Sequence, residues 1–535
     1  MMFKKLFFLL TVLFLLLLLS GTASAIPIND EDDFLKIGLN QASLGGTYEL
    51  GKDLDFTNKT FVPIGSGTYP FTGIFDGQGH EIKGIDYSFN TGGNQGIFRS
   101  LQDSQITNLI INSSNISTSG THNSIGILAG QVNNSTIDNV TLMNCSVGTS
   151  GNNVGILAGQ INGSMISNIT VEIDGGSTIC IVKGKGYVGG LAGLVNNSTI
   201  KDVYVNSGLL TATENNLGGL VGDLINSTVE SSYYIGSMTS DRDNVGGLVG
   251  RVENSTIFQC FSISDIRGRA AIGGFVGVIR DDSGTGRTSI ENSFAEGTIA
   301  GTSYVGSFVG RVNQNVKLNI VSSYAFCSDV SPPQFNLPFI AFVQSGVLVT
   351  VDDSFGLYDT LLGPFAYGIP ISETQFKNID TFMLAGTLVT TDWDITESLS
   401  SNSIWYTDGV LPPQLRFVAV DSSGGNNSGN NSGNNRGNNS GSSIHGGNNG
   451  GSRFGHAYVI QPTPLIPSSN SPSGPEIVPN IQNSSQESDI LSPQNNNPSD
   501  QESNFSRKLV LLLLIGIVIA VGAVFYIWNK NRRLK

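Results

Sequence analysis

Four groups of residues are the candidates for catalysis, because each combines an acidic side chain with a second acidic, basic or histidine side chain. Paired carboxyl groups are what glycoside hydrolysis requires, because one protonates the leaving oxygen while the other acts as nucleophile or base. Cleavage or modification of a polysaccharide is therefore a function that the sequence allows. The four groups are Asp76 with His80, Asp241 and Asp243 with Arg242, Asp281 and Asp282 with Arg280, and Asp352 with Asp353.

The four acidic groups also have a simpler explanation. Asp76-Gly-Gln-Gly79 has the composition of a tight turn, in which glycine takes backbone conformations that other residues avoid. The other three groups stand far apart in the chain and do not recur at one site. We therefore predict that the protein is not an enzyme and has no catalytic residues. A polysaccharide-active enzyme is kept as the alternative.

Metal and cofactor sites are not expected. The chain has four cysteines and four histidines, and it lacks the CxxC pairs typical of structural zinc sites. The loop at Asp281 and Asp282 could hold calcium weakly, but the glycine- and aspartate-rich repeat of calcium β-rolls is absent. The cysteines are predicted to be buried as small apolar residues, and whether they pair is left open. They are Cys145, Cys180, Cys260 and Cys327.

The composition argues against nucleic acid as a partner. The formal net charge is −14, from 28 Lys and Arg against 42 Asp and Glu, whereas phosphate backbones require clustered basic side chains. Charged residues make up only 13% of the chain and hydrophobic residues 39%, with 67 glycines. This balance is typical of many short strands joined by tight turns.

A glycine-rich stretch at residues 245–257 has some features of a phosphate-binding loop. It lacks the lysine that such a loop needs, and related stretches recur along the chain. The leading glycines are separated by 30, 29, 34, 29, 28, 27 and 33 residues, which indicates stacked repeats. These glycines are Gly96, Gly126, Gly155, Gly189, Gly218, Gly246, Gly273 and Gly306.

Each repeat contains three short apolar runs, as at residues 245–250, 256–261 and 262–266. Their lengths and their β-branched residues favour strands over helices. We therefore predict an all-β fold, a right-handed parallel β-helix built from repeats of about 30 residues. Equivalent apolar side chains should stack along the axis as internal ladders.

The repeated glycines and asparagines are predicted to have structural roles. Glycine at a stacked corner either accepts positive φ or permits close approach of two backbones. Asparagine tolerates the left-handed conformation, and asparagines stacked in register can form a hydrogen-bonded ladder. The glycines assigned to this role are Gly126, Gly155, Gly190, Gly219, Gly247, Gly274 and Gly310.

N-glycosylation is a second interpretation of the asparagines. Thirteen Asn-x-Ser/Thr sites lie between Asn58 and Asn254, and exported asparagines in turns are accessible. The competing explanation is that Asn-Ser-Thr is the turn chemistry of the repeat itself. The sites that recur with the repeat are Asn134, Asn197, Asn226 and Asn254.

Segments at both ends of the chain differ from the repeats. Residues 1–25 have the basic start, apolar middle and Ala-Ser-Ala end of a secretory signal peptide, with an uncleaved anchor as the alternative. Residues 26–95 are predicted to form an N-terminal cap and the first coils, with a short amphipathic helix at residues 29–44. Residues 96–330 carry the repeats. Residues 331–420 are predicted to hold the last coils and a cap, with a helix at residues 372–384.

The predicted C-terminal cap contains two tryptophans, Trp393 and Trp405, which we expect to close the open end of the helix. Residues 421–508 are rich in Asn, Gly, Ser and Pro and are predicted to be a disordered linker. Residues 509–528 are uncharged and long enough to cross a bilayer, and residues 529–535 form a basic tail. The positive charges predict a single-pass membrane protein with the repeats outside and the C-terminus in the cytoplasm.

The repeat resembles that of the GLUG-motif proteins, whose core is Gly-Leu-hydrophobic-Gly. Gly219-Leu-Val-Gly222 and Gly247-Leu-Val-Gly250 match this core, and the similarity extends over residues 30–417. The resemblance implies a secreted or surface-anchored, adhesin-like protein, and the arrangement of stalk and anchor looks like surface proteins of methanogenic archaea. Some proteins with this motif are zinc peptidases with His-Glu-x-x-His. Here His80-Glu81 is followed by Gly84 in place of the second histidine, so that activity is not carried over.

These observations predict a non-enzymatic cell-surface protein with a role in adhesion or in the architecture of the envelope. Expected partners are the membrane and either glycans or other surface proteins, because solenoids present long binding faces. A spacer without a specific ligand is a further possibility. Binding specificity is expected in loops that differ between repeats, such as residues 281–287.

Overall fold

The computed structural model describes residues 24–89, 93–118, 120, 124–173, 180–284, 286–329, 337–357, 367–383, 393–396, 403–406 and 412–415. The linker, membrane segment and basic tail predicted above lie outside the described residues, as does almost all of the predicted signal peptide. None of the helices in the described ranges has the length and apolar character needed to span a bilayer.

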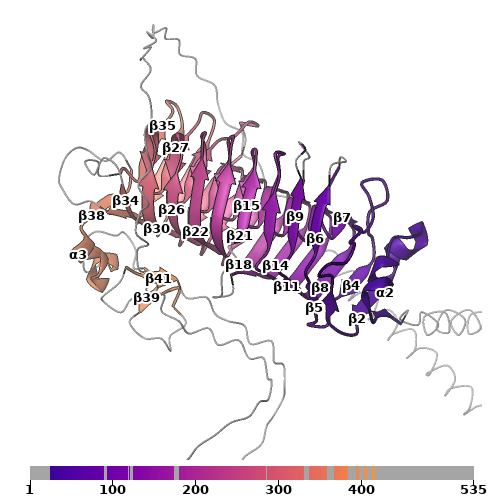
Figure 1. Ribbon diagram of the computed structural model, residues 1–535. Coiled ribbons are helices and arrows are strands. Elements are labelled where there is room, and N and C mark those ends of the chain that lie inside the picture. The colour runs from indigo at the N-terminus through magenta and orange to yellow at the C-terminus, as the bar shows by residue number, and fades with distance from the viewer. Residues whose placement is uncertain are drawn as a thin grey trace, which may run out of the picture. The chain divides into compact units, whose positions relative to one another are not determined.

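The described strands stack into a parallel β-solenoid of about ten turns with a repeat of about 29 residues (Figure 1). Ala129 pairs with Ala158 of the next coil and with Phe98 of the coil before. Three stacks of strands, called here the large, nine-stranded and five-stranded sheets, run along the described part of the chain. The predicted arrangement of stacked parallel strands is confirmed.

One coil illustrates the plan. It starts with β23 (Val245–Gly246) in the five-stranded sheet and turns into β24 (Val249–Glu253) in the nine-stranded sheet. After a bend at Asn254, β25 (Thr256–Phe258) and β26 (Phe261–Arg267) lie in the large sheet. Each coil therefore turns at sharp corners, and the polypeptide returns to the same corner one repeat later.

The other strands follow this plan with few exceptions. The nine-stranded sheet also contains β7 (Phe98–Gln102), β10 (Ala129–Asn133), β13 (Ala158–Asn162), β17 (Ala192–Asn196), β20 (Val221–Ile225), β28 (Val276–Ile279), β32 (Val309–Val312) and β35 (Ile340–Val343). The five-stranded sheet also contains β16 (Val188–Gly189), β19 (Leu217–Gly218), β27 (Ala270–Gly273) and β31 (Ser303–Gly306).

The large sheet holds the remaining strands of the stack. They are β1 (Ile26–Ile28), β2 (Thr47–Leu50), β3 (Leu54–Asp55), β4 (Ile74–Asp76), β5 (Glu81–Lys83), β6 (Asp86–Phe89), β8 (Gln105–Asn112), β9 (Asn115–Thr118), β11 (Thr136–Met143), β12 (Ser146–Gly148), β14 (Met165–Glu172), β15 (Ile181–Gly184), β18 (Thr199–Ala212), β21 (Thr228–Glu230), β22 (Tyr233–Ser240), β29 (Thr288–Glu291), β30 (Phe294–Ala300), β33 (Lys317–Val321), β34 (Tyr324–Asp329), β36 (Leu348–Asp352), β37 (Phe355–Leu357) and β38 (Ile369–Ile371).

Apolar side chains at equivalent positions form ladders inside the solenoid. In the nine-stranded sheet, Leu224 of one coil pairs with Val252 of the next, and Val252 pairs with Ile279. All three side chains are fully buried. Burial of each such side chain stabilises the fold by about 1.5–3 kcal/mol, so the ladders supply most of the stabilisation of the stack.

The repeated glycines permit close packing of two backbones at the first corner. A Cβ atom on Gly277 would lie 2.6 Å from the carbonyl oxygen of Gly250 and 2.7 Å from the backbone of Asn244 and Val245. Gly277 has no positive φ. Of the two roles considered for the repeated glycines, the structure supports close approach of backbones: a Cβ atom on Gly190, Gly219 or Gly247 would meet the carbonyl oxygen of the equivalent glycine in the next coil.

Asparagine occupies the bend between the nine-stranded sheet and the large sheet. Asn134, Asn197, Asn226 and Asn254 have φ between 43° and 49°, as expected for a residue that tolerates the left-handed region. The Nδ2 atom of Asn254 donates to Oδ1 of Asn226 at 2.8 Å, which is one rung of the predicted ladder. The four side chains are exposed, and their glycosylation stays a prediction.

A buried serine ladder accompanies the asparagines. The backbone N–H of Ser198 donates to Oγ of Ser227 at 3.0 Å, and the N–H of Ser227 donates to Oγ of Ser255 at 3.1 Å. Each hydroxyl group also donates to the carbonyl oxygen two residues earlier. The serine of Asn-Ser-Thr therefore satisfies buried backbone groups where the strands are interrupted.

The N-terminal end of the stack is closed by a short helix and an aromatic cluster. The helix predicted at residues 29–44 is divided into α2 (Glu31–Leu35), capped by Asp30, and a 3-10 helix at Gln41–Gly45. Phe34 of α2 is fully buried. Its ring lies 5.7 Å from Phe56 and 5.9 Å from Phe75, so the helix covers the apolar interior of the first coil.

The helix predicted at residues 372–384 is also shorter than expected. It consists of α3 (Glu373–Phe376), followed by a 3-10 helix at Ile379–Phe382. A capping box starts this helix, because Ser372 and Gln375 exchange hydrogen bonds. Asn378 starts the second segment by capping Asp380. Phe382 of this segment is buried, whereas Ile379 and Met383 are only partly buried.

The two tryptophans do not close the open end of the solenoid. Trp405 of β40 (Trp405–Tyr406) packs 6.1 Å from Phe294 and 5.8 Å from Tyr324, on the outer face of the large sheet. Trp393 packs against Phe355 in the same way. The expectation of an end plug is therefore wrong. The tryptophans pack instead at the side of the last coils, against an outer row of stacked aromatic rings. The row comprises Tyr204, Tyr233, Phe261, Phe294 and Tyr324.

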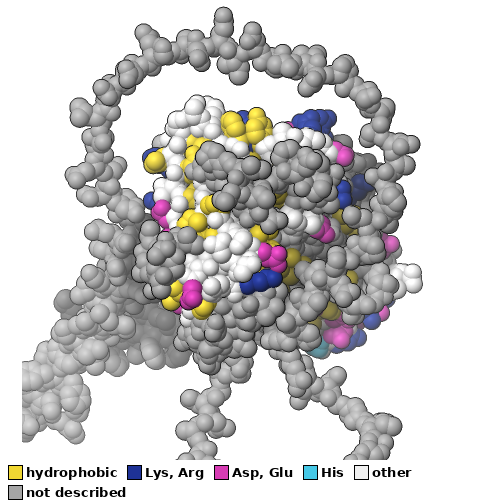
Figure 2. Space-filling view, turned by 90° about the vertical axis from the view of Figure 1, so that its left-hand side faces the viewer, with side chains coloured by type: hydrophobic (Ala, Val, Ile, Leu, Met, Phe, Trp, Pro, Cys, Tyr) yellow, Lys and Arg dark blue, Asp and Glu magenta, His cyan; other side chains and the backbone are white. Residues whose placement is uncertain are grey.

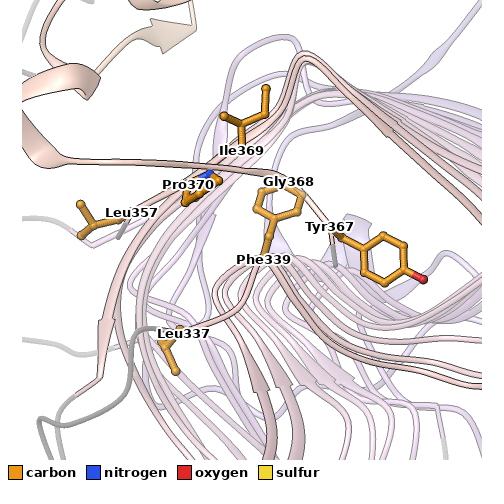
Figure 3. Close-up of a pocket in the computed structure, with 8 residues that line it drawn as sticks. Leu337, Phe339, Leu357, Tyr367, Gly368, Ile369 and Pro370 are labelled. Carbon is orange, nitrogen blue, oxygen red and sulfur yellow. The ribbon is translucent and has the colours of Figure 1, made fainter. Parts of the chain in front are cut away.

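The end of the interior is covered instead by the segment that leads into β38. Figure 3 shows this segment, from Tyr367 to Pro370, passing across the ring of Phe339. A Cβ atom on Gly368 would lie 2.9 Å from that ring. The crevice between them measures only about 10 Å³, the space of one water molecule. The remaining short strands, β39 (Ile395–Thr396) and β41 (Gln414–Leu415), flank β40.

The four cysteines are buried in the stack, as predicted. Their pairing was left open by the sequence, and in the structure all four are free thiols. Burial raises the pKa of Cys145 and of Cys260 to about 12 and that of Cys180 to about 11. Burial also raises the pKa of Cys327. Because the thiolate is the reactive species, the interior location and the raised pKa both suppress alkylation.

We expect iodoacetamide at pH 8 to label the native protein at least about a hundredfold more slowly than a peptide thiol. Unfolding in guanidinium should make all four cysteines reactive. Mass spectrometry after timed alkylation measures both rates. Rapid labelling of any one cysteine in the native protein would contradict the buried location of that thiol.

Candidate binding surface on the nine-stranded sheet

The predicted pair of Asp76 and His80 does not form. The carboxylate of Asp76 accepts hydrogen bonds from the backbone and side chain of Gln78 and from Asn108 of the next coil. His80 lies 3.0 Å from Asp53 instead. Asp76 therefore has the turn role that its sequence context suggested.

Two other predicted groups do not bring two free carboxylates together, since Asp243 pairs with an arginine and Asp353 is buried while Asp352 is exposed. Asp243 forms two hydrogen bonds, of 2.7 and 2.8 Å, with Arg269 of the next coil and none with Arg242. Asp353 has a positive φ at a bend, and its carbonyl oxygen accepts from the indole of Trp393. Charged side chains accordingly stand in small separate groups, several of them mixed in sign, on the face shown in Figure 2.

The group at Arg280, Asp281 and Asp282 lies beside the nine-stranded sheet. Arg280 Nη2 and Asp282 Oδ2 are 2.8 Å apart. Asp281 is buried, and its carboxylate accepts from the backbone of Ser283, Gly284 and Gly286. Burial raises the pKa of Asp281, but these hydrogen bonds and that of the Ser283 hydroxyl outweigh it and leave the pKa lowered. Asp281 therefore fixes the loop that carries Asp282.

A column of outward-facing side chains follows the same position through the nine-stranded sheet. Strand pairing places Leu194, Asp223 and Arg251 on successive coils, and Val278, Arg311 and Phe342 continue the column. The copies of the repeat therefore share their interior and differ in this outer column. Charged side chains occur only in the middle and later coils of this column.

Asp223 and Arg251 form a buried ion pair in this column. Arg251 Nε lies 2.5 Å from Asp223 Oδ1, and the two residues are only 2% and 7% exposed. Burial raises the pKa of Asp223 to about 6, against the hydrogen bond and charge of Arg251, which lower it. Glu253 and Asp282 each approach Arg251 to 3.9 Å. Three carboxylates from three coils thus surround one guanidinium group.

A polar depression of about 310 Å³ lies next to this ion pair. Its walls come from three successive coils, those of β28, β32 and β35, together with the 281–287 loop. The lining side chains are Arg280, Asp281, Asp282, Arg311, Asn313, Gln314, Asn315 and Gln344. The volume falls at the lower end of the range for small-molecule sites in proteins.

Arg311 is held at the depression by two aromatic rings. Its guanidinium carbon lies 5.4 Å from the ring centre of Tyr304 and 5.5 Å from that of Phe342. Cation–π contacts of this kind fix the plane of the guanidinium group while leaving its N–H groups available. In the described part of the chain, no acidic side chain forms a salt bridge with Arg311.

Three buried polar atoms at the depression have no hydrogen-bond partner within the described ranges. They are Nε of Arg280, Nε of Arg311 and Oδ1 of Asn313. Buried polar groups are nearly always satisfied, so each exception requires an explanation. Their concentration at one depression makes it the strongest candidate for a ligand site.

Sequence reasoning found Arg280, Asp281 and Asp282 and missed the other charged side chains of this surface. Asp223, Arg251 and Arg311 each follow the glycine that ends a repeat motif. Aligning the copies on that glycine would have brought these positions together. No group of three or more His, Cys, Asp or Glu side chains that could hold a metal ion occurs among the residues that the structure describes.

Comparison with known proteins shows the fold alone. No family model matches the sequence, and no curated protein matches it. A Bacteroides ovatus protein described as a putative immunoglobulin A1 protease aligns at 16% identity and a TM-score of 0.30 over 74% of this chain and 93% of its own. An endo-xylogalacturonan hydrolase from Aspergillus tubingensis aligns at 13% identity and a TM-score of 0.21 over 61% and 89%. The chain is a parallel β-solenoid with distant structural similarity to β-helix proteins.

Proposed function

We propose that this chain is a non-catalytic surface protein that binds partners through the outer face of its solenoid. The supporting observation is the disposition of charge. The acidic groups singled out in the sequence serve turns or pair with an arginine, as Asp76, Asp243 and Asp281 do. A rigid stack with an outer face that varies from coil to coil suits recognition, in adhesion or in envelope architecture.

The finer identity remains part of this proposal. The Gly-Leu-Val-Gly units support membership of the GLUG-motif proteins, and with it the right-handed helix and the methanogen-like source. Surface attachment rests on the signal-like start and on the apolar segment at residues 509–528. A glycoprotein with its repeats outside the cell, anchored by one transmembrane segment, is the arrangement that these features support together.

Incubation of the full-length chain with a panel of polysaccharides tests the proposal. We expect retention of one or more polysaccharides without release of reducing or unsaturated ends, because no paired catalytic carboxyl groups stand free at a common site among the described residues. Chromatography of the products and a pull-down of the polymers give the two readouts. Sustained release of new chain ends would overturn the non-catalytic reading.

One observation favours an enzyme as the second candidate. Asp223, Glu253 and Asp282 come from three coils and surround Arg251. If chain ends are released, replacement of the exposed Asp282 by asparagine should abolish the release. Activity that survives in Asp282→Asn would place the reaction elsewhere in the chain.

A further inference from the structure

We propose that the depression across β28, β32 and β35 binds a saccharide unit that carries a carboxylate group, such as a uronic acid residue of an acidic polysaccharide. This inference deepens the proposed binding function by naming the class of ligand. It rests on the two arginines at the depression, on the unsatisfied polar atoms beside them and on the balance of charge along the walls.

The two arginines are suited to a carboxylate. Arg311 is oriented by Tyr304 and Phe342 and forms no salt bridge with an acidic side chain in the described ranges. Arg280 contacts Asp282 through Nη2, which leaves its buried Nε without a partner. A guanidinium group presents its N–H donors in a planar fork that matches the two oxygens of a carboxylate. A carboxylate in the depression would accept from the terminal guanidinium N–H groups of Arg311, with the positive charge of Arg280 on the same wall.

The remaining lining groups are suited to hydroxyl groups. Oδ1 of Asn313 is a buried acceptor without a donor, and the exposed carboxylate of Asp282 is a second acceptor. Gln314 and Gln344 add side-chain amides, which bond to each other at 3.3 Å. Amide and carboxylate groups accept from hydroxyl donors, and the amide nitrogens donate in return. This set of groups fits a sugar ring better than an apolar ligand.

The charge balance favours a singly charged ligand. Arg280 and Arg311 are matched by Asp281 and Asp282 around the same depression. Asp282 would repel the second charge of a phosphate dianion, whereas one carboxylate can be placed against Arg311, away from Asp282. A neutral saccharide would leave the Arg311 fork without its acceptor. The depression therefore favours a ligand with one negative charge over a neutral ligand and over a dianion.

Calorimetric titration of the full-length chain tests this assignment. The probes are a trimer of 1,4-linked glucuronate, the corresponding neutral glucose trimer and inorganic phosphate. We expect the glucuronate trimer to bind at least about tenfold more tightly than either of the others, because charge-assisted hydrogen bonds are lost with the neutral trimer. Equal affinity for the neutral trimer, tighter binding of phosphate, or no binding of glucuronate would each overturn it.

Variants assign the binding to the depression. Arg311→Gln should weaken glucuronate binding by about tenfold to a hundredfold while leaving binding of the glucose trimer unchanged. Arg242→Gln removes the same charge from an exposed turn outside the depression and should leave the affinity unchanged. If Arg311→Gln shows an altered unfolding profile, Arg280→Gln provides the second measurement. Unchanged affinity in a folded variant of either arginine would contradict the site.

The outcome is separable from that of the proposed function. Glucuronate binding with release of new chain ends would keep the site and overturn the non-catalytic role. Retention of a different polymer without glucuronate binding would keep the role and overturn the site.

Discussion

Replacing Gly277 by alanine is expected to lower the free energy of unfolding by about 3 kcal/mol or more. The added Cβ would lie 2.6 Å from the carbonyl oxygen of Gly250 and 2.7 Å from the backbone of Asn244 and Val245. All of these are backbone atoms of neighbouring coils, so no flexible side chain can move aside. Relief of the overlap requires β28 to move away from β24 in the nine-stranded sheet and from β23 in the five-stranded sheet, which loosens the packing of the two coils.

Gly148→Ala is the matched control for this substitution. A Cβ on Gly148 would meet no atom within 4 Å, and this glycine also lacks a positive φ. We expect its stability to remain within about 0.5 kcal/mol of the wild type or to rise slightly. Chemical unfolding followed by circular dichroism measures both variants. Similar stability of Gly277→Ala and Gly148→Ala would show that close approach at the corner is not the reason for the repeated glycines.

The second large effect concerns the Asp223–Arg251 pair. Asp223→Ala should destabilise the protein at neutral pH by about 3–5 kcal/mol, because it leaves a buried guanidinium group without its acceptor. The double variant Asp223→Leu, Arg251→Val should recover most of this loss. Leu194 and Val278 already occupy the positions before and after the pair in the same column. The two apolar replacements would therefore extend apolar contacts that the fold already accommodates.

The same pair gives a pH dependence with a defined sign. The pKa of Asp223 rises from 3.8 to about 6 in the fold, chiefly through burial. The folded protein therefore binds a proton more tightly than the unfolded chain, so this group contributes stability below pH 3.8 that is lost as the pH rises to about 6. Unfolding of the wild type and the double variant between pH 4 and 7 checks both statements. A double variant as unstable as Asp223→Ala, or with the same pH profile as the wild type, would contradict this account.

The predictable parts of the fold are those whose residue types recur once in every repeat. The leading glycines recur at intervals near that of the stacked coils, and the αL corners at Asn226 and Asn254 follow from a residue type with a known tolerance. The buried cysteines were predictable because free cysteine behaves as a small apolar residue and is often buried. These features depend on local conformation and on burial, and both are visible in a single copy of the repeat.

The candidate site was less predictable because neighbours in a solenoid are far apart in sequence. Charged groups were sought among adjacent residues, such as Arg242 and Asp243. In the structure Asp243 binds Arg269, and Asp223 binds Arg251, one coil further along in each case. The prediction that the tryptophans close the end of the solenoid was wrong for a related reason. The outer aromatic row that holds Trp405 is visible only when rings such as Phe294 and Tyr324 are aligned by coil.

The covered ends of the stack also affect whether copies of the protein can associate end to end. A parallel stack carries unpaired N–H and C=O groups on its terminal coils, and such edges template further strands and lead to fibres. The Phe34 cluster covers one terminal coil, and the chain across Phe339 covers the interior of the other. These two covers limit growth by addition of further copies.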